Sequence, residues 1–266
     1  MRFSNLFCDT VLRLLACVFL IPVLSSCSVK EDRSGCPCLM VLDFSLYDGM
    51  DSSLADLLIT SHGEKVWEDT VDMAVYGQGY EAYVPRELLH VRVWSGTGGL
   101  ASEAGLSIPL GKDCPRIYMH DSDVEAAGED CHETVRLRKN HCVMRVTVAG
   151  DGGFPYRMTV RGNVAGYDAT GNPLPGDFEY VLHDDGFEDG YHVVLPRQLD
   201  SSLLLEIDDG TGEYRSFAIG QYIVSSGYDW QSDDLEDVTV TIDYALTEIR
   251  LSIKGWESVY VYEMIM

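Results

Sequence analysis

The chain has 266 residues, of which 46% are hydrophobic and 10% aromatic, so it can bury one large core or two ordinary ones and is not disordered as a whole. Its 43 acidic residues outnumber its 19 basic residues and give a formal net charge of −24. This charge repels phosphates, which excludes nucleic acid as a partner and excludes binding to an anionic membrane through charged side chains alone.

The beginning of the chain, residues 1–26, is predicted to be an export signal. Its apolar run LLACVFLIPVL is shorter than the about 20 residues of a transmembrane helix and fits the hydrophobic region of a signal. The motif Leu24-Ser25-Ser26-Cys27 resembles the lipobox of bacterial lipoproteins, in which a peptidase cleaves before the cysteine and the thiol carries a diacylglycerol. The resemblance implies cleavage between Ser26 and Cys27 and a covalent lipid on Cys27, with no other cofactor. The alternative is an ordinary soluble export signal with an incidental cysteine.

Residues 27–37 are predicted to form a tether between the lipid and the folded part of the chain. Each buried methylene group contributes ~0.8 kcal/mol, so two or more acyl chains hold a protein permanently in a membrane. Lys30-Glu31-Asp32 resembles the signal that sends some lipoproteins to the outer face of the outer membrane, and a solvated tether explains it equally well. The predicted localisation is the outer membrane, with a lipid anchor and exposure on the cell surface.

Five further cysteines follow Cys27, and outside the cytoplasm they can form disulfides. They allow at most two bridges, and the sequence does not choose the pairing. The motif Cys36-Pro37-Cys38 lacks the spacing and the additional ligands of a zinc site, so structural or free thiols are favoured over metal ligands. The five residues are Cys36, Cys38, Cys114, Cys131 and Cys142.

Alternation of apolar and polar residues dominates the chain after the tether, which is typical of strands that pack one face on a core. Turn sequences such as Gly171-Asn172-Pro173 separate the runs. Only residues 52–58 and 221–226 are predicted to form short helices. Strands without intervening helices indicate an all-β protein built of sandwiches. The alternating runs cover residues 40–46, 89–94, 135–138, 144–148, 156–161, 238–244 and 249–254.

The strands are too many for one small sandwich, and a domain boundary is predicted near Lys139-Asn140. The first β-sandwich would span residues 38–138 and the second residues 139–266. Basic residues gather between Arg136 and Arg161, beside this boundary. They could attract an acidic partner, but pairing with acidic side chains on neighbouring strands is the favoured interpretation.

The sequence contains no nucleophile-elbow, zinc-protease or P-loop motif, so an enzyme is not predicted. The Asp-Asp-Gly turns lack the spaced ligands of a calcium loop, and no catalytic or metal-binding residue is predicted. Trp67 and Trp94 could form an exposed platform for sugars, which would indicate a surface glycan-binding lipoprotein instead. Core or rim positions are favoured for these tryptophans.

Several segments together resemble one family, the fimbrial anchor lipoproteins of type V fimbriae, which include the minor-fimbrium anchor subunits. Glu31-Asp32-Arg33-Ser34-Gly35-Cys36-Pro37 is similar to the acidic pair and the Cys-Pro that precede the first strand of that family. The order and combination of the segments carry the resemblance over nearly the whole mature chain. The other segments are His90-Val91-Arg92-Val93-Trp94-Ser95-Gly96 and residues 135–148, 161–178 and 249–256.

The resemblance implies two tandem transthyretin-like β-sandwiches in an outer-membrane lipoprotein that anchors a fimbrial shaft, limits its length and joins it by strand exchange. The implied partners are fimbrial shaft or accessory pilin subunits and, through the acyl anchor, the lipid of the outer membrane. Only Cys27 carries over as a site residue. The last alternating run, residues 259–266, is expected to be buried between neighbouring strands, with no free arm after it.

Overall fold

The computed structural model describes residues 35–47, 50, 52–77, 79–149, 157–183, 190–208, 210, 214–243, 248–253 and 256–261. The predicted export signal, its cleavage site at Ser26 and Cys27, and the tether up to residue 34 lie outside these residues.

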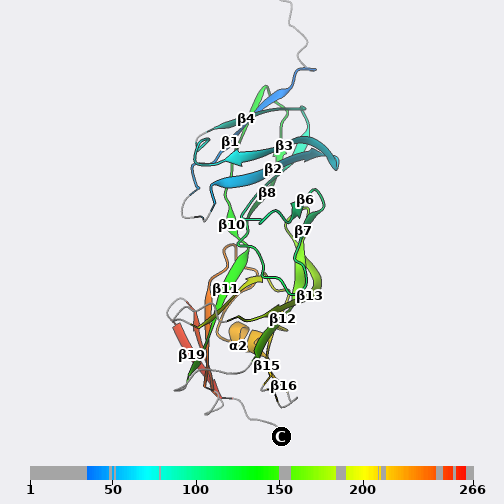
Figure 1. Cartoon of the computed structure of the whole chain (residues 1–266). Helices are drawn as coiled ribbons and strands as arrows, with labels where there is room; N and C mark the ends of the chain where they lie inside the picture. The colour runs from blue at the N-terminus through cyan, green and yellow to red at the C-terminus, as the bar shows by residue number, and fades with distance from the viewer. Residues whose placement is uncertain are drawn as a thin grey trace, which may run out of the picture. The chain divides into compact units, whose positions relative to one another are not determined.

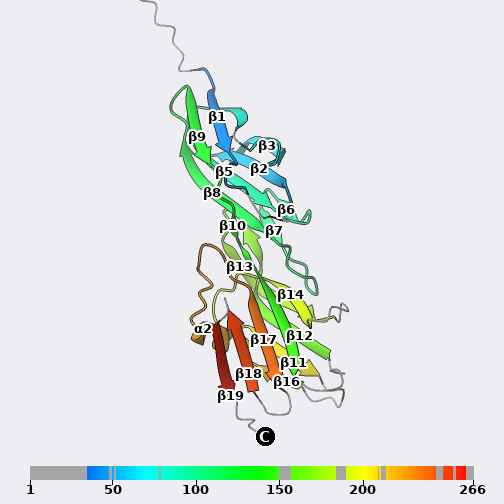
Figure 2. The ribbon, with the colours of Figure 1, turned by 90° about the vertical axis from the view of Figure 1, so that its left-hand side faces the viewer.

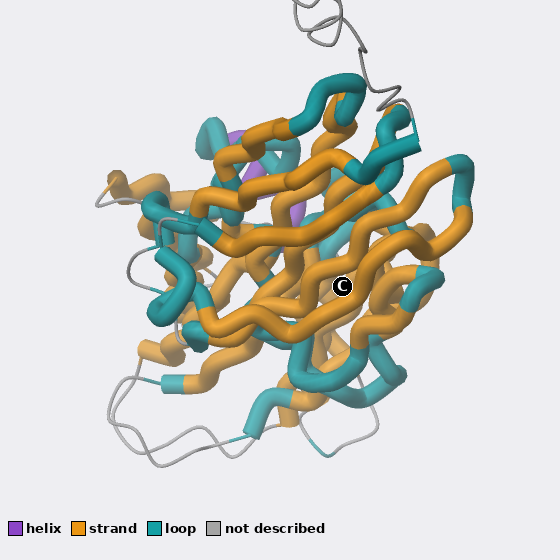
Figure 3. The backbone as a smooth tube through the Cα atoms, turned by 90° about the horizontal axis from the view of Figure 1, so that it is seen from above, coloured by secondary structure: helices purple, strands orange, loops and turns teal. Residues whose placement is uncertain are grey.

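Strands make up nearly all regular structure of the described chain, as Figures 1 and 3 show. The strands are β1 (Cys38–Asp43), β2 (Leu54–Ser61), β3 (Glu64–Asp72), β4 (Tyr80–Val84), β5 (Leu88–Ser95), β6 (Ala101–Ser102), β7 (Gly105–Ser107), β8 (Tyr118–Glu125), β9 (Asp130–Thr134), β10 (Arg138–Lys139), β11 (His141–Ala149), β12 (Arg157–Asp168), β13 (Pro173–Val181), β14 (Tyr191–Pro196), β15 (Leu204–Asp208), β16 (Tyr214–Phe217), β17 (Val238–Asp243), β18 (Glu248–Ile253) and β19 (Trp256–Val261).

The single helix among the described residues is α2 (Ile219–Ser225), which confirms the short helix predicted at residues 221–226. The other predicted helix, at residues 52–58, is wrong, because this segment lies in β2 and pairs with both β3 and β5. The predicted all-β class is confirmed. No helix in the described part of the chain is long and apolar enough to cross a membrane.

Two sheets contribute to the first hydrophobic core. One has the strand order β4-β1-β9, and the other has the order β10-β8-β5-β2-β3. Every second residue of β1, namely Cys38, Met40 and Leu42, is fully buried, as the alternation predicts. β1 runs antiparallel to β4 and parallel to β9. The first strand after the tether is therefore hydrogen-bonded along both of its edges.

A second hydrophobic core collects residues from the later strands. The sheet β14-β11-β17-β18-β19 contributes Met144 and Val240, the sheet around β12 and β15 contributes Val160 and Leu205, and α2 contributes Ile223. Within the first of these sheets, β11 pairs in parallel with β17, and β17, β18 and β19 follow one another antiparallel (Figure 2).

β19 is the terminal strand of its sheet, and among the described residues it pairs with β18 alone. The expectation that residues 259–266 lie between two neighbouring strands is therefore wrong for residues 259–261, which belong to β19. Residues 262–266 lie outside the described residues.

Strands from the two halves of the chain pair with each other. β6 and β7 precede residue 139, yet β7 pairs with β12, with Gly105 opposite Asp168 and Ser107 opposite Gly166 (Figure 1). Trp94 of β5 also belongs to the second hydrophobic cluster. Residues from Pro37 onward form one compact unit. The division into residues 38–138 and 139–266 thus stays a prediction, and the segment 101–107 crosses it.

Candidate functional site

A buried polar network lies where β5 and β8 meet the β6–β7 hairpin and the turn between β12 and β13. Alternation along β5 places Leu89, Val91 and Val93 in the first core and puts Arg92 and Trp94 on the opposite face of the strand. That opposite face is not open to solvent: Arg92 is 6% exposed and Trp94 1% exposed. β5 is therefore covered on both faces, which the sequence analysis did not anticipate for a strand with one polar face.

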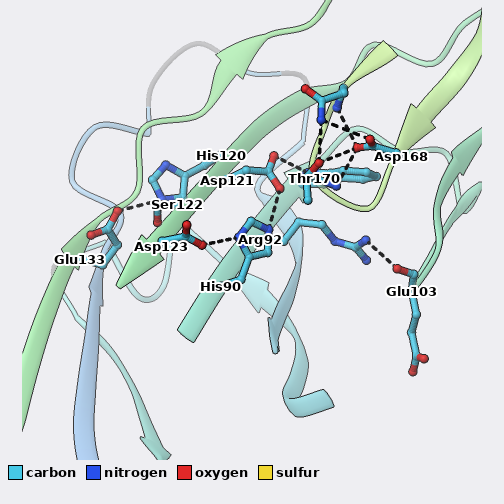
Figure 4. A network of polar contacts seen from close by, with 12 residues as sticks. His90, Arg92, Glu103, His120, Asp121, Ser122, Asp123, Glu133, Asp168 and Thr170 are labelled. Atoms are coloured by element: carbon cyan, nitrogen blue, oxygen red, sulfur yellow. Dashed lines mark hydrogen bonds and ion pairs between the residues drawn. The ribbon is translucent and has the colours of Figure 1, made fainter. Parts of the chain in front are cut away.

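Arg92 lies at the centre of this network (Figure 4). The Arg92 guanidinium lies 4.4 Å from the centroid of the Trp94 ring, a distance at which the cation is attracted to the ring face. Arg92 also donates through Nη2 to the Ser102 carbonyl at 2.8 Å and through Nη1 to the Glu103 carbonyl at 3.3 Å. Burial lowers the pKa of Arg92. Arg92 thereby connects β5 to the β6–β7 hairpin.

Asp121 of β8 accepts a hydrogen bond from the indole ring of Trp94. Trp94 donates through Nε1 to Asp121 Oδ2 at 3.1 Å, and His90 Nε2 lies 3.7 Å from Asp121 Oδ1. Burial raises the pKa of Asp121, although the hydrogen bond from Trp94 opposes the shift. His90 Nδ1 also lies 3.1 Å from Asp123 Oδ1, so two acidic side chains flank this histidine.

The turn between β12 and β13 closes over Asp121 (Figure 4). The Asp168 carboxylate accepts hydrogen bonds from Thr170 N at 2.8 Å and Asn172 N at 2.9 Å, which confirms the turn predicted around Gly171-Asn172-Pro173. Gly171 adopts φ +76°, and a Cβ at this position would lie 2.8 Å from Asp121 Oδ2. Only glycine combines this backbone conformation with so close an approach to the carboxylate.

The cavities in the network lie near the lower limit of the volumes usual for small-molecule sites, one just above it and one below it. One cavity of about 240 Å³ borders His90, Arg92 and Thr170, and another of about 310 Å³ borders Asp121 and Gly171. Pockets for small molecules usually measure ~300–1,000 Å³. No group of three or more His, Cys, Asp or Glu residues that could hold a metal ion occurs in the described part of the chain. The network is a set of polar contacts between strands, in which His90 Nε2 and Asp121 Oδ1 are buried without a hydrogen-bond partner.

The segment that connects β10 to β11 is held by acidic side chains of a later loop. Lys139 donates through Nζ to Asp237 Oδ1 at 2.6 Å and through its backbone N to Asp234 Oδ1 at 2.8 Å. Arg138 forms an ion pair with Asp233 of the same loop. These contacts fix the path of the chain between the two cores.

Three of the basic residues near the predicted boundary form ion pairs with acidic side chains of the same chain. Besides the pairs of Arg138 and Lys139, Arg161 of β12 binds Glu206 on β15 at 2.7 Å and Glu179 on β13. For Arg161 the favoured interpretation of pairing with acidic side chains on neighbouring strands is confirmed, whereas the acidic partners of Arg138 and Lys139 lie in a loop.

His141 begins β11 directly after this segment and is expected to make the stability of the fold depend on pH. It is 1% exposed, its Nδ1 lies 3.1 Å from the Ile117 carbonyl oxygen, and its ring packs edge-on against Tyr118. Burial lowers the pKa of His141 from 6.5 to about 4. The folded state therefore favours the neutral imidazole, and the stability that this contributes is present above pH 6.5 and lost as the pH falls through about 4.

We expect His141→Asn to remove this pH dependence, because the asparagine amide can still donate to the Ile117 carbonyl but does not titrate. Between pH 7 and pH 4 the wild type should lose about 3 kcal/mol more unfolding free energy than the variant. Urea unfolding of both proteins at pH 7, 5.5 and 4 measures the difference. Parallel losses in the two proteins would show that His141 does not cause the dependence.

The site residues predicted from the sequence and those of the network do not overlap. Ser26 and Cys27 lie outside the described residues, so their roles stay predictions. Arg92 and Asp121 were not predicted as a site. The signal that could have identified Arg92 is a cation between two valines in a strand otherwise rich in apolar residues.

No family model matches the sequence, and no curated protein matches it. Solved structures match its fold. The fimbrial anchor protein Mfa2 from Porphyromonas gingivalis aligns with a TM-score of 0.60 at 13% identity, over 84% of this chain and 99% of that chain. A protein from Bacteroides thetaiotaomicron that is provisionally described as polysaccharide-binding aligns with a TM-score of 0.60 at 12% identity, over 85% of this chain and 98% of its own.

A provisionally named adhesin from Bacteroides ovatus aligns with a TM-score of 0.57 at 12% identity, over 85% of this chain and 95% of that chain. At these identities the likeness is one of fold. It extends through nearly the whole length of each of the three neighbours.

Proposed function

We propose that the protein is a lipid-anchored component of the cell surface that attaches a fimbrial shaft to the outer membrane and ends its assembly by strand exchange with pilin subunits. The observation that carries the proposal is the fold shared with the fimbrial anchor protein Mfa2 over 99% of that chain. The lipobox at Leu24-Ser25-Ser26-Cys27 supports the same role, because a shaft anchor needs one end fixed in a membrane.

The edge of the sheet that ends in β19 supports the strand-exchange part of the proposal. In the described part of the chain, β19 pairs along one edge only. A terminal strand presents a row of backbone N–H and C=O groups to which an extended segment of another subunit can add. Such a joint depends mainly on backbone hydrogen bonds and tolerates differences between pilin sequences.

The polar network fits a protein that carries tension. In an anchor, force enters through the tether at the start of the chain and leaves through the strands that hold the shaft. The pairing of β7 with β12 and the contacts of Arg92 and Trp94 connect the residues of the first core to those of the second. A joint made of several hydrogen bonds that must break together resists such a load better than a flexible linker.

A surface glycan-binding lipoprotein is the second candidate, and the description of the Bacteroides thetaiotaomicron neighbour favours it. The predicted platform of Trp67 and Trp94 is not present, because Trp94 is buried and the half-buried Trp67 donates through Nε1 to Tyr80 Oη at 3.0 Å. Calorimetric titration with oligosaccharides tests this candidate, and saturable binding would support it.

Deletion of the gene tests the anchor function. We expect fimbriae to be shed into the medium or to become abnormally long, because nothing would fix the shaft or end its growth. Electron microscopy gives the lengths, and immunoblots of pilin in the culture supernatant give the shed fraction. Complementation with the wild-type gene should restore short, attached fimbriae. Normal, cell-attached fimbriae in the deletion strain would contradict the proposal.

A further inference from the structure

The five cysteines after the lipobox occupy different environments. Cys36 is exposed, whereas Cys114 and Cys142 are buried in the second hydrophobic cluster. Cys114 Sγ lies 3.3 Å from the Pro115 carbonyl oxygen, and Cys142 is hydrogen-bonded to Tyr228. These contacts do not bring the two buried thiols of the second cluster together.

Cys38 and Cys131 are different, because they lie on the same face of two neighbouring strands and belong to the same hydrophobic cluster. Cys38 is the first residue of β1, and Cys131 lies in β9, the parallel neighbour of β1 (Figure 2). In the register of this pair Met40 is opposite Cys131, so Cys38 lies on the same face of the sheet, one diagonal step away. Cys38 is fully buried in the first hydrophobic cluster, and Cys131 packs against it. The Cys38 thiol is also among the groups that raise the pKa of Cys131.

We propose that Cys38 and Cys131 are joined by a disulfide in the exported protein. The two Sγ–H bonds break, one Sγ–Sγ bond forms, and two protons and two electrons leave the pair. The acceptor is the disulfide of a thiol-disulfide oxidoreductase outside the cytoplasm, which is reduced to a dithiol in the same exchange. The inference rests on export of the chain and is independent of the fimbrial role.

The bond requires a small adjustment at the start of β1. Neighbouring strands lie about 4.8 Å apart and rise about 3.3 Å per residue, so residues offset by two positions in a parallel pair have Cα atoms roughly 8 Å apart, whereas disulfides span about 4.4–6.8 Å. Cys38 can make the adjustment because it is the terminal residue of its strand, and its Cα has one ladder partner, Val84 of β4, across the opposite edge. The ladder with β9 begins only at Leu39.

The environment of the pair indicates when the bond forms. Burial and, to a smaller extent, the neighbouring Cys38 thiol raise the pKa of Cys131 to about 12. The thiolate is the species that attacks a disulfide, so the folded, reduced protein would react slowly. Oxidation should therefore take place during export, before β1 packs against β9.

The position of the bond suggests its use. β1 is the first strand after the tether, and it contacts β9 and β4 through backbone hydrogen bonds. A pull on the tether would remove these bonds one after another from the end of the strand. A covalent link between Cys38 and Cys131 would place the load on β9 as well and keep β1 in the sheet.

Peptide mapping of the full-length protein tests the proposal. The protein is purified from membranes of its own host, alkylated with iodoacetamide under denaturing conditions and digested with trypsin without reduction. We expect mass spectrometry to find residues 34–65 linked to residues 117–136, a peptide whose only cysteine is Cys131. Carbamidomethylated Cys131, or a link from Cys131 to Cys114 or Cys142, would overturn the proposal.

Because residues 34–65 contain both Cys36 and Cys38, single variants identify the partner. Cys36→Ser should keep the linked peptide, since the proposed bond does not involve Cys36. Cys38→Ser should leave Cys131 alkylated. Loss of the link in Cys36→Ser, or its persistence in Cys38→Ser, would assign the bond to Cys36 and overturn the proposal. If Cys38→Ser folds poorly, the peptide map of the wild type still shows whether Cys131 is linked to residues 34–65.

Discussion

Replacement of Cys27 by alanine is expected to leave the protein unacylated and mislocalised and to abolish its labelling with a fatty-acid analogue. The lipidation predicted from Leu24-Ser25-Ser26-Cys27 depends on the thiol, which alanine lacks. Each acyl methylene group contributes ~0.8 kcal/mol, and stable anchoring needs two or more such signals. The formal charge of −24 offers no substitute, because an acidic surface is repelled by anionic head groups. The share of the protein found in the outer membrane should therefore fall from nearly all to background.

Cys36→Ala is the matched control, because Cys36 is an exposed cysteine in the same stretch of chain but outside the lipobox. It should keep both the fatty-acid label and the membrane location. Cell fractionation and click-chemistry labelling of the two variants and the wild type provide the comparison. A persistent label on Cys27→Ala would show that another residue carries the lipid, and the predicted anchor would then be wrong.

Much of the strand content could be predicted from local alternation alone. β1, β5, β11, β12, β17 and β18 coincide with alternating runs, since one face of each strand is buried and a period of two survives in the sequence. Residues 52–58 were misassigned because the spacing of Leu54, Leu57 and Leu58 also fits one face of a short helix. The segment forms a strand because β2 is hydrogen-bonded to both β3 and β5. These pairings cannot be read from the local sequence of β2.

The polar network could not be predicted, because it depends on which segments meet. β7 has three residues, too few to show a periodic pattern, yet its pairing with β12 brings the β6–β7 hairpin to Arg92. The sequence shows a cation within an apolar strand but not the carbonyl groups of Ser102 and Glu103 that receive its hydrogen bonds. The parallel pairing of β1 with β9 also joins segments that are distant in sequence, so the sequence does not show that Cys38 and Cys131 lie on neighbouring strands.

Arg197 is the side chain whose loss should damage the second core most. It is 8% exposed and donates through Nη1 to the carbonyl oxygens of Trp230 at 2.5 Å and Ser232 at 2.7 Å, and through Nε to Asn140 Oδ1 at 3.1 Å. Burial lowers the pKa of Arg197. Its contacts hold the loop that carries Asp233, Asp234 and Asp237, the partners of Arg138 and Lys139.

We expect Arg197→Ala to reduce the free energy of unfolding by about 3–5 kcal/mol, because buried acceptors that lose their donor cost ~1–3 kcal/mol each. Arg161→Ala is the matched control: Arg161 also contacts two partners, Glu206 and Glu179, but its side chain is 45% exposed, and such pairs contribute ~0–1 kcal/mol. Guanidinium unfolding followed by tryptophan fluorescence measures both. Equal, small effects of the two substitutions would contradict the role given to Arg197. A large effect confined to Arg197→Ala would show that the buried hydrogen bonds of Arg197 to Asn140, Trp230 and Ser232 stabilise the fold.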